Sequence, residues 1–181
     1  MTQISFRTPG TTTRPASARP VALVAVAALA VDAVVSAVAG PDALSDHMRG
    51  AGAVSEVAVG LAFLACAATL VLLRPVAGWR GLMWWLGPVG LALGGVIMVC
   101  VPAVGSEPPG PLVDLALLPA LVGMVAAGIV GTTRRVWPWW TGLGVALFLP
   151  VMFTAPYNSV LMALIWLAVA STGSTARPAT P

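Results

Sequence analysis

GAVSEVAVGLAFLACAATLVLL, residues 52–73, is an apolar run that contains a single charged residue, Glu56. A transmembrane helix needs ~20 consecutive, mostly apolar residues, so this stretch is long enough to cross a bilayer. Across the 181 residues, 59% are apolar, 8% are charged and the mean hydropathy is +0.96. A soluble domain carries roughly a quarter charged residues. The sequence therefore predicts an all-α fold, a polytopic transmembrane helical bundle.

Five further segments have the same character. The last two lie within TGLGVALFLPVMFTAPYNSVLMALIWLAVAS, which as one helix would measure ~46 Å and exceed the hydrocarbon core. Pro150, Pro156 and Asn158 favour a turn in its middle. We predict six helices in a bundle over 21–172, between disordered cytoplasmic tails at 1–20 and 173–181; their approximate spans are 21–39, 52–73, 82–101, 112–131, 139–155 and 157–172. A single kinked helix at the end would reduce the number to five.

The arginines predict the orientation. All nine basic residues are arginine, and the tails and connectors carry three, one, two, none, two, none and one of them in chain order. Arginine-rich connectors stay on the cytoplasmic side, so this alternation predicts that both termini are cytoplasmic. The arginines are not massed on one face, which argues against nucleic acid as a partner. A composition rich in Ala, Gly, Val and Pro, without lysine, favours a bacterial plasma membrane.

The first span has a second interpretation. After the apolar run VALVAVAALAV at 21–31, residues Ala37 to Ala39 read A-V-A, which matches a signal-peptidase site. Cleavage after Ala39 would leave five helices with unchanged orientation. The nearly continuous apolar character of residues 21–39 favours a helix that is retained.

Six tryptophans flank the two connectors that we place in the cytoplasm. The indole ring is amphipathic and prefers the headgroup boundary. We therefore predict that these six side chains are interfacial anchors: Trp79, Trp84, Trp85, Trp137, Trp139 and Trp140.

Acidic residues occur in the outer halves of the predicted helices. Glu56 shares a helical face with Gly52 and Gly60, and a face of small residues should contact protein rather than lipid. Asp32 lies in the outer half of the first span, so antiparallel packing of the first two helices would bring it near Glu56. Asp114 adds a third acid on the same side.

Two interpretations of these acids stay open. A charge within a bilayer costs about 3 kcal/mol at the centre, so such residues have a partner or a purpose. Crowded carboxylates favour protonation of one of them, which predicts a proton or cation site in an outward-facing polar vestibule. In the structural alternative, Glu56 pairs with the counter-charge Arg49, and Asp32 hydrogen-bonds to Ser36 or across a helix interface. His47 is a further counter-charge, which we expect to be a solvated loop residue.

Glycines at helical spacing indicate close helix packing. Gly90 and Gly94 form a GxxxG pattern, and Gly128 and Gly131 lie in the next span. Such Gly-rich faces also fit a homo-oligomer or a larger membrane-protein partner. The alternative to a solute-handling protein is therefore a non-catalytic accessory or structural subunit.

The sequence holds no GxSxG, HExxH or Cys/His constellation, so we predict that the protein is not an enzyme and holds neither metal nor cofactor. The chain does carry an R-x-x-x-W-W-x-G pattern twice, starting at Arg80 and Arg135, and a glutamate in SEVAVGLAFLA. With these features it resembles small polytopic integral membrane proteins of unassigned function from actinobacteria. The resemblance implies a plasma-membrane setting and brings no activity with it.

Overall fold

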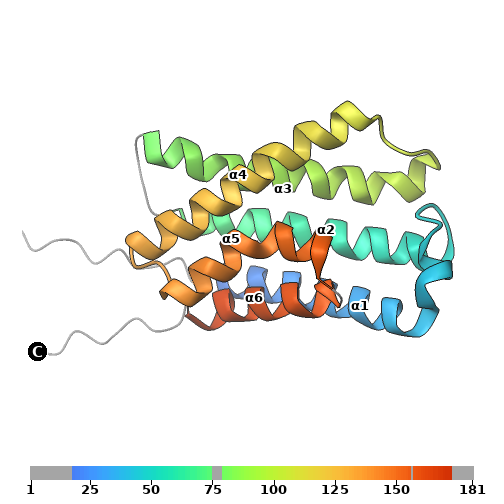
Figure 1. Cartoon of the computed structure of the whole chain (residues 1–181), viewed down its shortest axis with the longest axis horizontal. Helices are drawn as coiled ribbons and strands as arrows, with labels where there is room; N and C mark the ends of the chain where they lie inside the picture. Colours follow the sequence, from blue (N-terminus) through green and yellow to red (C-terminus); the bar gives the residue numbers. More distant parts are fainter. Residues whose placement is uncertain (1–17, 75–78, 156, 173–181) are drawn as a thin grey trace, which may run out of the picture.

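Six helices make up the part of the chain that the structure, a computed structural model, describes: residues 18–74, 79–155 and 157–172. They are α1 (Ala18–Leu44), α2 (Gly50–Leu72), α3 (Trp79–Val104), α4 (Gly110–Thr133), α5 (Trp139–Thr154) and α6 (Asn158–Thr172) (Figure 1). Helices form here because each backbone N–H and C=O in an apolar medium must be satisfied within its own segment. The predicted all-α helical bundle is confirmed.

Helix length divides the bundle into two groups. The first four helices are long and apolar enough to cross a membrane, which fits a multi-pass membrane protein. The last two have 16 and 15 residues, or ~24 and ~22 Å, less than the ~30 Å of a hydrocarbon core. They are separate helices, because α5 ends at Thr154 and Tyr157, with φ of 56°, redirects the chain before α6. A single kinked helix at the end of the chain is therefore wrong.

Most observed helices extend beyond the predicted spans. The third and fourth predicted spans were 82–101 and 112–131, and each helix gains two or three residues at both ends. The first predicted helix ended at residue 39, and here Gly40 takes φ of 76°, which breaks α1 before a short final turn. A positive φ suits glycine because it has no Cβ.

The six helices form a closed ring. Each helix packs against its neighbours in sequence, and contacts between α1 and α6 close the ring. Figure 1 shows α4, α5 and α6 in front of α3, α2 and α1. Aromatic rings fill the centre: the centroid of Phe63 lies 5.8 Å from that of Phe148, which lies 6.0 Å from that of Trp166. These three residues, from α2, α5 and α6, are called the aromatic cluster below.

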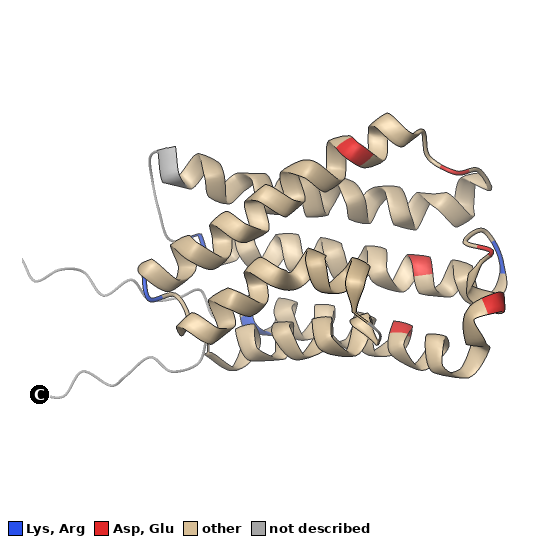
Figure 2. Cartoon of the chain, viewed as in Figure 1, with Lys and Arg blue, Asp and Glu red and all other residues tan. Residues whose placement is uncertain are grey.

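The two ends of the bundle differ in charge. We call the end where α1, α3 and α5 begin the arginine end, and the opposite end the acid end. Figure 2 shows the acidic residues in the half of the bundle toward the acid end. Of the arginines that the structure describes, Arg49 lies at the acid end and the others lie at the opposite end. The α5–α6 hairpin begins at the arginine end and stops about halfway along α1 and α2 (Figure 1). This separation follows the charge pattern that the sequence predicts.

Glycines hold the ring together by allowing close backbone contact. A Cβ added at Gly90 would lie 2.3 Å from the Ala120 nitrogen, and one at Gly123 would lie 1.8 Å from the Gly87 nitrogen. A Cβ at Gly128 would lie 2.4 Å from the oxygen of Gly142. Real Cβ atoms do not approach so closely, so these faces require glycine. The predicted close packing is confirmed at Gly90, Gly128 and Gly131, within the chain itself. A Cβ at Gly94 would lie 3.5 Å from the Phe63 ring, an ordinary contact, so close packing is not confirmed there.

Candidate functional site

Asp32 is a carboxylate buried in the wall of a bundle that is otherwise apolar. It is 4% exposed, and on α1 it continues a buried face that includes Ala25 and Leu29. The spacing of three or four residues places all three side chains on one side of the helix. The helices packed against α1 are α2 and α6, so the carboxylate lies where these three helices meet.

Two serine hydroxyls bind the two oxygens of this carboxylate. Ser55 on α2 donates from Oγ to Asp32 Oδ1, and Ser159 on α6 donates from Oγ to Asp32 Oδ2. Ser159 Oγ also lies 3.1 Å from Asn158 Oδ1. We call Asp32, Ser55, Asn158 and Ser159 the Asp32 centre. It joins residues 23 and 127 positions apart in the chain, so it links α1 to both of its neighbours.

The turn between α5 and α6 positions Asn158 and Ser159. Asn158 donates from Nδ2 to the carbonyl oxygen of Met152 at 2.7 Å, and its Oδ1 accepts from the backbone N–H of Ser159 at 2.7 Å. The amide side chain thus ties the start of α6 to the end of α5. Non-helical backbone at membrane depth is stable only where its polar groups find such partners. The short hairpin therefore ends at the depth of Asp32.

Glu56 lies between this centre and the surface. Its Oε2 is 3.2 Å from Nδ1 of His47, and the two side chains are 18% and 56% exposed respectively. Glu56 follows Ser55 directly, so it lies beside the Asp32 centre, and His47 contacts it from the α1–α2 connector at the acid end. Arg49, the counter-charge expected from the sequence, is exposed, and the ion pair with Glu56 comes from His47 instead. His47 is an exposed residue of the connector, as expected, and it also contacts Glu56 as a counter-charge.

The connector between α1 and α2 places His47. Asp46 Oδ1 accepts a hydrogen bond from the Met48 backbone N–H at 3.0 Å, which closes a turn around His47. A Cβ at Gly52 would lie 2.2 Å from the Asp46 carbonyl oxygen, so the connector packs directly on the start of α2. The imidazole is thereby held 3.2 Å from the Glu56 carboxylate, a contact that the spacing of nine residues alone does not indicate.

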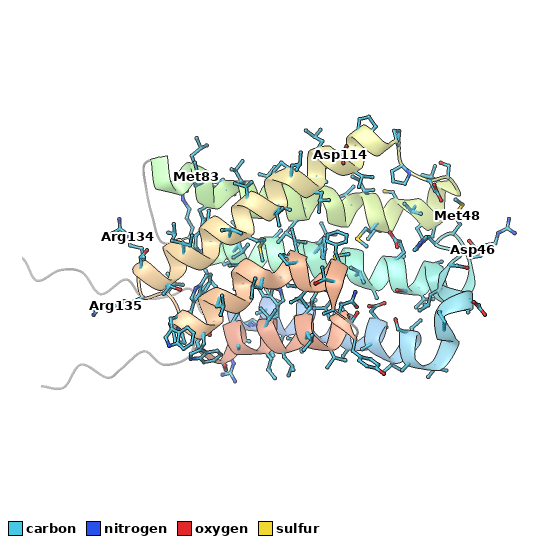
Figure 3. All side chains as sticks on the ribbon, in the orientation of Figure 1. Asp46, Met48, Met83, Asp114, Arg134 and Arg135 are labelled. Atoms are coloured by element: carbon cyan, nitrogen blue, oxygen red, sulfur yellow. The ribbon has the colours of Figure 1, made fainter. Side chains whose placement is uncertain are left out.

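The three predicted acids do not form one group. Asp32 and Glu56 lie in the same region, since Ser55 bonds to the first and precedes the second. We expected Asp32 to hydrogen-bond either to Ser36 or across a helix interface. Among the described residues it bonds across two interfaces, to Ser55 and Ser159, and not to Ser36. Asp114 is exposed on α4, which packs against α3 and α5, and Figure 3 places it away from the α1–α2 connector.

Two of the six predicted tryptophan anchors are part of the core. Trp84 and Trp137 are buried, their ring centroids lie 5.7 Å apart in a stacked arrangement, and Trp84 Nε1 donates to the Leu70 carbonyl oxygen at 3.0 Å. For these two the prediction is wrong, because the ring of helices turns their faces inward. Trp139 and Trp140 are exposed, as anchors must be.

The remaining two tryptophans, Trp79 and Trp85, lie in the first two turns of α3. Trp85 is half-buried with the Arg74 guanidinium 5.5 Å above its ring, a cation–π contact. The side chain of Trp79 lies outside the described residues. Sequence periodicity places all six near the arginine end without showing which face of each helix is turned inward.

Sequence reasoning did not single out Ser55 and Ser159 as site residues. Serine is common at helix starts and in turns, so neither position stands out by residue type. A signal was present in the order of residues: Ser55 precedes Glu56, the one charged residue in its apolar run, and Ser159 follows the turn residue Asn158. Recognising Ser159 as a partner of Asp32 requires knowing that α6 packs on α1, and recognising Ser55 requires knowing which faces of α1 and α2 meet.

The chemistry of the Asp32 centre is that of an oxygen-only site. Its polar atoms are one carboxylate, two hydroxyls and one amide oxygen, which suit a proton or a hard cation with a single positive charge. Asp32 itself is buried, so the predicted outward-facing vestibule does not expose it in this conformation; Glu56 and His47 provide the contact with the surface.

Comparison with known proteins gives no relative from which an activity can be transferred. The resemblance to small actinobacterial membrane proteins stays a prediction. No protein-family model, no curated protein and no solved structure matches this chain.

Proposed function

We propose that this multi-pass protein resides in a bacterial plasma membrane with both termini in the cytoplasm, and that it handles a proton or a small monovalent cation through Asp32. One observation carries the proposal: a buried carboxylate at the junction of three helices has only neutral hydrogen-bond partners among the described residues. A charge at membrane depth is costly without compensation. A bound proton or cation supplies that compensation.

The surroundings of Asp32 favour reversible binding. Burial disfavours the charged carboxylate, whereas two hydroxyl donors and the positive end of the α6 dipole, at Asn158 and Ser159, stabilise it. Reversible binding also requires partners that fit both a charged and a neutralised carboxylate. A hydroxyl can serve both forms, since it donates to a carboxylate and accepts from a protonated carboxyl group or a cation.

Access to Asp32 comes from the acid end. His47 is more than half exposed and contacts Glu56, which follows the Asp32 partner Ser55. These groups form a short polar route from the surface. Toward the arginine end, the aromatic cluster of Phe63, Phe148 and Trp166 fills the centre of the ring. Transport across the membrane therefore requires this cluster to move, and we expect Asp32 to exchange its proton or cation with the acid end.

A flux measurement tests this function. The full chain is reconstituted into vesicles with a pH-sensitive dye inside, and proton and sodium gradients are imposed in turn. We expect a flux that Asp32→Asn abolishes and Glu56→Gln reduces, while Asp114→Asn, a control on an exposed acid outside the centre, leaves it unchanged. Equal flux in Asp32→Asn and wild type, or no flux in wild type under either gradient, overturns the proposal.

The accessory-subunit alternative retains one supporting observation. The α5–α6 hairpin stops at the depth of Asp32 and leaves the acid-end halves of α1 and α2 uncovered, with Val34, Val38 and Val54 exposed. A partner helix could pack there, whereas the glycine seams are occupied within the chain. Extraction in a mild detergent followed by mass spectrometry tests it: a stoichiometric partner supports this role, and a clean monomer contradicts it.

A further inference from the structure

An apolar groove between α5 and α6 opens on the outer surface of the bundle, apart from the Asp32 centre. It encloses about 310 Å³, and its lining includes Trp140, Thr141, Val151, Leu164 and Ala168. Trp140 and Leu164 are exposed, so the groove faces the surroundings of the protein rather than its core. From Trp140 to Val151 it extends ~16 Å along α5, at 1.5 Å per residue. A groove of this length and lining suits an acyl chain.

Thr141 gives the groove a polar feature near its arginine end. Its side chain is 1% exposed, and its Oγ1 has no hydrogen-bond partner in the described structure. Other helical threonines bond to the carbonyl four residues earlier: Thr69 Oγ1 donates to Ala65 O and Thr132 Oγ1 to Gly128 O, both at 2.8 Å. An unpaired hydroxyl in an apolar setting costs free energy. Thr141 lies in the first turn of α5, near the arginine end. An ester carbonyl at the glycerol level of a lipid lies at this depth and can accept the hydrogen bond.

The charge at this end of the groove favours an anionic headgroup. Arg134 and Arg135 are exposed in the connector that leads into α5, and Figure 3 places both at the arginine end. The six acidic residues all lie toward the other end (Figure 2). Arginine binds phosphate oxygens bidentately, and basic residues at a membrane surface attract anionic lipid by about 1 kcal/mol each. Trp140 lies between these arginines and the groove, as an amphipathic ring at the boundary should.

We propose that one anionic glycerophospholipid binds here. Its acyl chain lies in the α5–α6 groove, an ester carbonyl accepts the hydrogen bond of Thr141, and its phosphate is held by Arg134 and Arg135. The site belongs to the outer surface of the shortest hairpin in the bundle. A lipid bound there fills the space between two helices that are too short to match the bilayer. The proposal does not depend on what Asp32 binds.

Native mass spectrometry of the full chain in a mild detergent, titrated with phosphatidylglycerol or phosphatidylcholine, tests the site. We expect one phosphatidylglycerol to bind more tightly than phosphatidylcholine. The pair Arg134→Gln and Arg135→Gln should weaken phosphatidylglycerol by about 25-fold, at roughly fivefold per arginine, and leave phosphatidylcholine unchanged. Thr141→Val should weaken both lipids by about fivefold, because both carry ester carbonyls. Ala168→Phe, which fills the groove, should abolish both.

Matched controls separate this site from general effects of charge and bulk. The pair Arg19→Gln and Arg74→Gln removes the same charge at the same end, and Ala27→Phe adds the same bulk on an exposed face of α1. Both should bind lipid as wild type does. Equal binding of the two lipids to wild type, or an effect of the control pair as large as that of Arg134 and Arg135, overturns the proposal. A dimer that Ala168→Phe abolishes also overturns it, since a second copy then fills the groove.

Thr141→Val preserves shape, and the arginine changes lie on the surface, so these variants keep the proposal falsifiable even if Ala168→Phe fails to fold. Lipid binding is measured without any flux. Its absence therefore refutes the lipid site alone, and the absence of flux refutes the Asp32 proposal alone.

Discussion

The acid end and the arginine end of this bundle place polar groups in opposite ways. At the acid end a buried carboxylate from α1 is shared by hydroxyls from α2 and α6, and a second carboxylate beside it reaches the surface through His47. At the arginine end the charges are outside, and two stacked indoles occupy the interior. One end is built from polar contacts between helices, the other from aromatic packing. The difference predicts that aromatic packing at the arginine end contributes more to the stability of the fold than the polar contacts at the acid end do.

The strongest test of that difference removes the aromatic packing. Trp84→Ala deletes a buried side chain, its stack with Trp137 and its hydrogen bond to the Leu70 carbonyl. We expect a loss of about 3–5 kcal/mol in the free energy of unfolding, as for other buried large-to-small changes. The measurement is thermal or denaturant unfolding in detergent micelles. Trp139→Ala, at a side chain 69% exposed, is the control and should change little. Equal effects would mean that the indole stack does not carry the stability of this end.

The next test removes the carboxylate at the acid end. Asp32→Leu leaves the hydroxyls of Ser55 and Ser159 without their acceptor, and interhelical hydrogen bonds in membranes contribute about 0.6 kcal/mol on average, at most about 1.7. With the cost of burying unpaired hydroxyls, we expect a loss of about 2 kcal/mol. Asp32→Asn keeps an acceptor oxygen and should lose less. The same unfolding assay decides it; a leucine variant as stable as wild type would show that Asp32 does not join the helices.

The sequence predicts how far along a helix a residue lies, but it does not predict toward which side of the helix the side chain points. A rise of 1.5 Å per residue and the alternation of arginines predict that Asp32 and Glu56 lie in the half away from most arginines. Inward or outward direction depends on which helices are neighbours. Trp84 and Trp139 occupy equivalent places in the repeated R-x-x-x-W-W-x-G pattern, yet one is buried and the other exposed. Hydrophobic residues suit both lipid and core, so apolar periodicity does not separate the two.

Contacts across the chain are the second class of feature that the sequence does not predict. Asp32 and Ser159 meet because α6 closes the ring on α1, and nothing local to either segment specifies that closure. The glycines were more informative. Small residues at intervals of four positions predict close approach whatever the partner helix is, and Gly90 and Gly128 both lie in such contacts. Features that depend on one helix were predictable from the sequence. Features that depend on which helices pack against each other were not.

A smaller effect separates the two halves of the Asp32 centre. Ser159→Ala removes the bond that connects α1 to α6, together with the contact to Asn158 Oδ1, whereas Ser55→Ala removes only the bond between α1 and α2. We expect a loss of about 1 kcal/mol for Ser159→Ala and somewhat less for Ser55→Ala. A double-mutant cycle with Asp32→Asn isolates each coupling. If Ser159→Ala also accelerates hydrogen exchange in α6 and Ser55→Ala does not, the α5–α6 hairpin is the element that this bond holds.

The smallest expected effect concerns the surface pair at the acid end. His47→Gln removes the contact with Glu56, and because the imidazole is more than half exposed the pair should contribute at most about 1 kcal/mol. Arg49→Gln, two positions along the same connector, should have no such effect, since His47 and not Arg49 contacts Glu56. The measurement is the coupling of each variant to Glu56→Gln in the unfolding assay, at low and at high salt. Coupling with His47 that weakens in high salt identifies an exposed ion pair. Coupling with Arg49 instead would return the acid end to the arrangement expected from the sequence, in which the guanidinium of Arg49 is the counter-charge of Glu56.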